Sequence, residues 1–103
     1  KAGKVGPAYC TGVGKAMMAF LDEAELNKVI SKQAFHKYTE HTITTAKALR
    51  KELAFIKKEG ISFDRQEHEE KIICISSPIL TSSGKVIGGL SITSSIDIYI
   101  VLF

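Results

Sequence analysis

The stretch "YCTGVGKAMM" near the start of the chain contains a glycine–lysine pair of the kind that holds phosphate. A phosphate-binding P-loop is spelled G-x-x-x-x-G-K-[ST], with a glycine five residues before the pair and a hydroxyl after it. Here Tyr9 stands at the first glycine and Ala16 follows Lys15. The dinucleotide pattern G-x-G-x-x-G fails as well, because Met17 stands at its third glycine. Neither nucleotide-binding pattern fits.

Gly12 and Gly14 leave a different kind of anion site open. They stand where a helix is expected to begin, and the free backbone N–H groups of a first helical turn favour a negative charge. Two small residues there would let a ligand approach the backbone. They would equally let the helix pack closely against a sheet, and the residues alone do not separate these two interpretations.

Other reactive side chains form no catalytic pattern. Cys10 and Cys74 are the two cysteines, and their spacing suggests reduced, buried thiols rather than a disulfide framework. His36 and His41 fall on different helical faces, and His68 lies in a charged stretch, so all three are expected at the surface. We expect no cofactor, no metal site and no nucleophile elbow.

The chain has 103 residues, of which 45% are hydrophobic and 24% charged, so one globular domain is expected. The net charge of +3 is too small to indicate nucleic-acid binding. The apolar runs are too short for a membrane span, and we expect a cytoplasmic protein.

Three helices are predicted before residue 60. The first starts at Thr11. The second has Asp22 as its cap, with Glu25 three residues later. The third follows Thr44 or Thr45 and ends at Gly60, with one apolar stripe formed by Ala46, Leu49, Leu53 and Ile56.

After residue 60 the pattern changes to strands. A short extended piece and a charged, exposed turn, "ISFDRQEHEE", precede two β-rich runs joined by "TSSG", where Gly84 supplies a positive φ. The order predicts an α+β fold. Because two strands alone make no stable sheet, further strands are expected upstream of residue 1.

Three segments in order resemble the effector-binding domain of IclR-family bacterial transcriptional regulators. They are "GKVGPAYCTGVGKAMMAFLDEAEL", "YTEHTITTAKALRKELAFIKKEGISFDRQEH" and "IICISSPILTSSGKVIGGLSIT". The resemblance implies a GAF- or profilin-like antiparallel sheet flanked by helices, apparently lacking its N-terminal strands. Residues 1–103 would then be a partial ligand-sensing domain that binds a small organic acid or sugar acid. It would form dimers or tetramers, and operator DNA would be bound through a winged helix-turn-helix absent from this chain.

The resemblance also implies a site. The N–H groups of Gly12 and Val13 would hold a carboxylate, Asp64 would accept from ligand hydroxyls, and Cys74 and Thr93 would point inward as small donors. Ile72, Met17 and Ile92 would supply an apolar wall.

Two positions depart from the family pattern. Lys71 replaces a usual glycine and could either reach over the pocket or be solvated, and Val13 is bulkier than the common alanine. The run "SSIDIYIVLF" replaces the family's turn and terminal helix. Two alternatives stay open: a structural dimerisation domain with a self-filled pocket, and a small enzyme with Cys10 or Cys74 as nucleophile.

Overall fold

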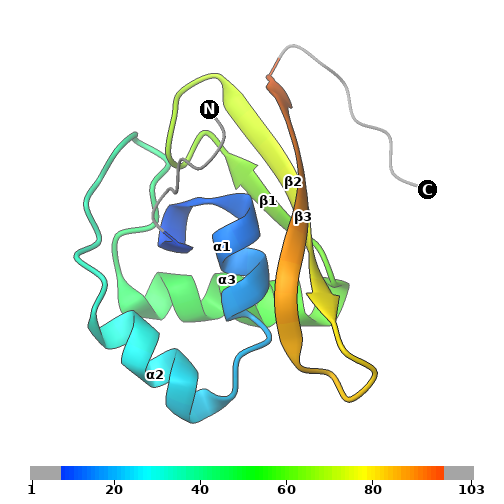
Figure 1. The fold of residues 1–103 in the computed structure, drawn as a ribbon. Helices are drawn as coiled ribbons and strands as arrows, with labels where there is room; N and C mark the ends of the chain where they lie inside the picture. Colours follow the sequence, from blue (N-terminus) through cyan, green and yellow to red (C-terminus); the bar gives the residue numbers. More distant parts are fainter. Residues whose placement is uncertain (1–7, 97–103) are drawn as a thin grey trace.

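A computed structural model describes residues 8–96. A short 3-10 turn, η1 (Ala8–Cys10), leads into three helices: α1 (Gly12–Met18), α2 (Glu23–Ser31) and α3 (Ala46–Glu59). Three strands follow: β1 (Ser62–Arg65), β2 (Ile72–Leu80) and β3 (Val86–Ser95). Figure 1 shows α1 lying beside the sheet, with α2 and α3 on the same side.

The helix ends are set by local signals, as predicted. The Asp22 carboxylate accepts a hydrogen bond from the Glu25 N–H at 2.8 Å. The Thr45 hydroxyl accepts from the Ala48 N–H at 3.1 Å and so begins α3. Gly60 ends α3 with a left-handed φ of 79°, a conformation that glycine adopts without strain.

The strands form an antiparallel sheet in the order β1-β2-β3. The predicted hairpin joins β2 to β3, and Gly84 there has a φ of 89°. β1 forms from the short extended piece, so the described residues hold three strands rather than two. In this register Asp64, Cys74 and Thr93 lie side by side on neighbouring strands. The α+β class is confirmed, while further strands upstream would lie outside the described residues.

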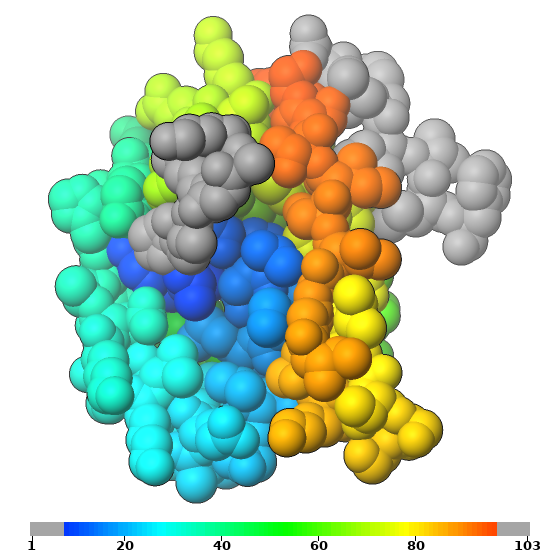
Figure 2. Space-filling view, in the orientation of Figure 1, coloured from blue at the N-terminus to red at the C-terminus, as the bar shows by residue number. Residues whose placement is uncertain are grey.

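One face of the sheet carries α1, which packs against all three strands and against α3. Close approach is allowed by glycine, because a Cβ on Gly89 would come within 2.6 Å of the Val13 side chain. The core lies on this side and includes Leu49, Leu53 and Ile56 from α3. In Figure 2, α1 is visible as the blue surface between β3 and the cyan α2 segment.

None of the helices in residues 8–96 is long and apolar enough to cross a membrane. The predicted apolar run at the end of the chain falls outside the described residues after Ile96.

Candidate ligand-binding pocket

A pocket of about 540 Å³ opens between the start of α1 and the sheet. Seven of the eight residues of the predicted site lie in its wall: Gly12, Val13, Met17, Asp64, Ile72, Cys74 and Thr93. The rest of the wall is formed by Ala8, Thr11, Gly14, His68, Glu69 and Ser91. Whether these residues bind a ligand remains a prediction, but they share one hollow of the size that small-molecule sites have.

Ile92 does not belong to this wall, and its expected role was wrong. It is 73% exposed, on the face of the sheet opposite α1. Successive residues of a strand point to opposite faces, so Thr93 and Ile92 could not both line the pocket.

Lys71 is exposed and also lies outside the pocket wall. Its φ is 65°, in the left-handed region, and its N–H donates to the Gln66 side-chain oxygen at 2.9 Å. A positive φ is adopted most easily by glycine, which accounts physically for the glycine expected at this position.

Two side-chain hydrogen bonds hold the start of α1 in place. The Thr11 hydroxyl accepts from the Gly14 N–H at 3.2 Å, and the Ser62 hydroxyl of β1 donates to the Gly12 carbonyl at 2.6 Å. The N–H groups of Gly12 and Val13 belong to the first helical turn, whose amides have no partner within the helix. A Cβ on Gly12 would lie 2.6 Å from the Ser76 Oγ. Gly12 therefore serves close packing, and it also leaves its backbone at the pocket wall.

Small polar side chains line the sheet side of the pocket. The Cys74 Sγ and the Thr93 Oγ1 are 3.3 Å apart, within hydrogen-bond distance for sulfur. Next along the strands, the Ser76 hydroxyl donates to the Ser91 Oγ at 2.9 Å. Of these residues, Cys74, Ser91 and Thr93 line the pocket, and they can offer hydroxyl and thiol hydrogens to a ligand that enters the hollow.

Asp64 is the acidic group of the predicted site, and it is buried, with an exposed fraction of 5%. Its carboxylate accepts from the Glu67 N–H at 2.8 Å, which fixes its orientation. Burial raises the pKa of Asp64, although the hydrogen bond from the Glu67 backbone and the charge of Lys15 act in the opposite direction. Burial thus disfavours the charged form of this carboxyl group.

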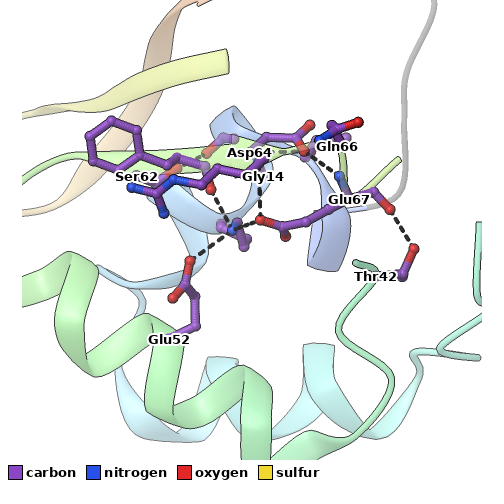
Figure 3. A network of polar contacts seen from close by, with 12 residues as sticks. Gly14, Thr42, Glu52, Ser62, Asp64, Gln66 and Glu67 are labelled. Carbon is purple, nitrogen blue, oxygen red and sulfur yellow. Dashed lines mark hydrogen bonds and ion pairs between the residues drawn. The ribbon is translucent and has the colours of Figure 1, made fainter. Parts of the chain in front are cut away.

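Lys15, the lysine of the glycine–lysine pair, is fully buried behind this wall. Its ammonium group donates to the Glu67 and Glu52 carboxylates at 2.7 and 2.9 Å, and to the Phe63 carbonyl at 2.7 Å. Figure 3 shows these three bonds converging on one nitrogen between β1, α3 and the turn after β1. Lys15 thus joins three elements through a single charge.

Glu67 is buried as well, against the expectation of an exposed charged turn. Burial raises its pKa more than the neighbouring Lys15 lowers it. One carboxylate oxygen accepts from Lys15, whereas its Oε1 has no hydrogen-bond partner within residues 8–96. The Glu67 carbonyl accepts from the Thr42 hydroxyl at 2.5 Å, so the long connection after α2 holds this turn in place.

The Cys10 thiol does not resemble a catalytic nucleophile. Burial, followed by the charges of Asp64 and Glu67, raises the pKa of Cys10 to about 12. Nucleophilic cysteines instead have a lowered pKa, since the thiolate is the reactive form. Among residues 8–96 no group of three or more histidine, cysteine and acidic side chains could hold a metal ion.

Comparison with known protein families gives the context for this pocket. Residues 1–99 match the family model described as bacterial transcriptional regulator IclR C-terminal. The chain belongs to the IclR C-terminal domain family. The predicted resemblance is therefore confirmed.

Individual relatives agree with this family. The chain is 34% identical over 93 residues to the HTH-type transcriptional regulator KdgR of Escherichia coli K12, covering 90% of this chain and 35% of that protein. The crystal structure of the C-terminal domain of E. coli KdgR has a TM-score of 0.88 at 33% identity, covering 94% of this chain and 59% of that one. The chain thus spans about a third of the length of such curated relatives.

A second solved structure is a complex with a small acid. The inducer-binding domain of the PobR transcription factor from Acinetobacter, as a double mutant in complex with 3-hydroxybenzoic acid, has a TM-score of 0.82 at 27% identity. It covers 88% of this chain and 54% of that chain. The relatives bear the names of transcriptional regulators rather than enzymes, in agreement with the expectation that this IclR-family domain is not catalytic.

Proposed function

We propose that this IclR-family domain senses a small carboxylate or sugar acid in the pocket beside α1. The observation that supports this most is the convergence on one hollow of first-turn amides, a buried carboxyl group and paired thiol and hydroxyl groups. Amides and hydroxyls are donors for a carboxylate, while Asp64 can accept from ligand hydroxyls. The 3-hydroxybenzoic acid of the PobR complex belongs to the same chemical class.

The proposed mechanism is a shift between assembly states of a longer regulator. A ligand that fits one state better moves the equilibrium toward it by its difference in affinity. Leu90 and Ile92 are 68% and 73% exposed on the sheet face opposite α1, and exposed apolar surface of this kind is common where proteins associate. The domain would form dimers or tetramers, and operator DNA would be contacted by a separate winged helix-turn-helix.

Thermal unfolding against a panel of small carboxylates and sugar acids tests the sensing role. At about a hundred times its dissociation constant, a bound ligand stabilises the fold by roughly 2.7 kcal/mol, so the unfolding midpoint rises by several degrees. Thr93→Val and Asp64→Ala remove a hydroxyl and a hydrogen-bond acceptor from the pocket wall, and each should reduce the shift strongly.

Thr44→Val is the matched control, because Thr44 is exposed and is not part of the pocket wall. A shift that survives in both pocket variants would place the ligand elsewhere. A folded domain that responds to no acid in the panel would favour a purely structural role in dimerisation.

A further inference from the structure

The electrostatic composition of the pocket wall raises a difficulty for an acidic ligand. Asp64 and Glu69 are the acidic residues of the wall, and Asp64 is buried while Glu69 is exposed. A ligand carboxylate would meet like charges there, and the repulsion is costliest at the buried Asp64. The charge of Lys15 acts on Asp64 from behind the wall, but Lys15 is not part of the wall. Its buried ammonium group already donates to three acceptors, so it has no donor left for a ligand.

His68 is the one side chain on this wall, within residues 8–96, that can carry a positive charge. It follows Glu67 in the turn between β1 and β2 and is half-buried. An imidazole N–H is a donor in either protonation state, and a hydrogen bond to a carboxylate is stronger than one between neutral groups. The position of this ring therefore matters for any acid in the pocket.

The ring of His68 packs against the ring of Tyr38. Its centroid lies 4.7 Å from that of Tyr38, edge to face at 75°. The Tyr38 ring makes a second edge contact with His36 at 4.6 Å. The same connection is tied to the turn by the Thr39 hydroxyl, which donates to the Gln66 carbonyl at 2.5 Å. The aromatic contact restricts the ring, and the hydrogen bond holds the turn that carries it.

We propose that His68 makes the pocket selective for acids: its ring N–H donates to the ligand carboxylate and offsets Asp64 and Glu69, and Tyr38 positions the ring. This inference rests on the proposed function, since it names the residue by which the same pocket recognises its ligand class. Tyr38 acts through His68 and is a positioning residue.

Alkylation of Cys74 tests this role without a known ligand. The Cys74 thiol lines the same pocket, and iodoacetate and iodoacetamide differ mainly in that the former carries a carboxylate. Because both reagents attack the same thiolate, the ratio of their rates cancels the thiolate fraction and reports how well the pocket accepts the negative charge. Mass spectrometry of the digested protein separates Cys74 from the buried Cys10.

Replacing His68 with phenylalanine keeps an aromatic ring against Tyr38 but removes the donor. We expect the iodoacetate-to-iodoacetamide ratio to fall by about tenfold or more, the effect of losing a charge-assisted hydrogen bond. Tyr38→Leu should lower the ratio about two- to threefold by releasing the ring, while the iodoacetamide rate alone stays the same. His41→Phe, at an exposed histidine, is the matched control and should leave the ratio unchanged.

An unchanged ratio in both His68→Phe and Tyr38→Leu would overturn the role of His68. So would an equal fall in His41→Phe, which would indicate a general charge effect. Protection of Cys74 from iodoacetamide by an acid from the thermal panel reports separately on the proposed function. Protection with an unchanged ratio rejects His68 alone, whereas a His68-dependent ratio without protection by any acid rejects the sensing role alone.

Discussion

Replacing Lys15 with methionine is expected to lower the free energy of unfolding by about 3–5 kcal/mol at pH 7, the usual cost of breaking a buried ion pair. The ammonium group is fully buried and bonds to two carboxylates and a carbonyl on three elements. Without it, the Glu67 carboxylate would stay in the interior with no counter-charge. Glu52 is less affected, because 28% of its side chain is exposed to water.

The loss should shrink on acidification. Burial already raises the pKa of Glu67 above its ordinary 4.5, and removing Lys15 takes away the charge that lowers it. A group whose folded pKa is raised contributes stability below its unfolded pKa and loses it as the pH rises through the folded value. Chemical denaturation of Lys15→Met should therefore show a smaller deficit at pH 5 than at pH 7.

Lys51→Met serves as the control, since Lys51 is exposed on α3 and should change stability by less than about 0.5 kcal/mol. If Lys15→Met loses less than about 1 kcal/mol of unfolding free energy, equally at both pH values, the ion pairs of Lys15 with Glu52 and Glu67 do not stabilise the fold as proposed.

Replacing Gly12 with alanine should destabilise the domain by about 1–3 kcal/mol and abolish most ligand binding. The new Cβ would lie 2.6 Å from the Ser76 Oγ and 3.3 Å from the Cys74 Cβ, so the Ser76 hydroxyl must turn away from Ser91 or α1 must move away from β2. Because the Ser76 side chain is buried and hydrogen-bonded, we expect α1 to move, which would displace the first-turn amides from the pocket. Alanine favours a helix over glycine by about 1 kcal/mol. A net loss of stability would therefore show that the clash of the new Cβ with β2 outweighs this gain.

Gly88→Ala in β3 is the control for this glycine-to-alanine change. A Cβ on Gly88 would meet only the Ile79 side chain, at an ordinary contact distance of 3.8 Å. It should leave both the unfolding midpoint and the ligand-induced shift within error of the parent. If Gly12→Ala unfolds and binds like Gly88→Ala, close packing of α1 on the sheet is not what shapes the pocket.

Features encoded within a few residues were predictable from the sequence. The caps at Asp22 and Thr45 and the terminating Gly60 depend on neighbours three or four positions away. The exposure of Ile92 was predictable too, because alternation along β3 already assigns Ile92 and Thr93 to opposite faces.

The buried charges were not predictable in this way. Lys15 and Glu67 are separated by 52 positions, and their pairing exists only once α1 lies on β1. Charged stretches are mostly solvated, so "DRQEHEE" gave no local sign that Asp64 and Glu67 are buried or that His68 reaches the pocket. The one available signal was the resemblance, which placed Asp64 at the site but said nothing of Lys15 or His68.

The most direct measurement of the central claim is a two-dimensional ¹⁵N–¹H NMR titration of the domain with the acid that gives the largest thermal shift. Our account predicts that the amide signals of Gly12, Val13 and Thr93 move together with one dissociation constant, while those of Leu90 and Ile92 on the opposite face move little. Shifts confined to the separate hollow lined by Asp22, Lys57 and Lys85, or no shift at the start of α1, would contradict it.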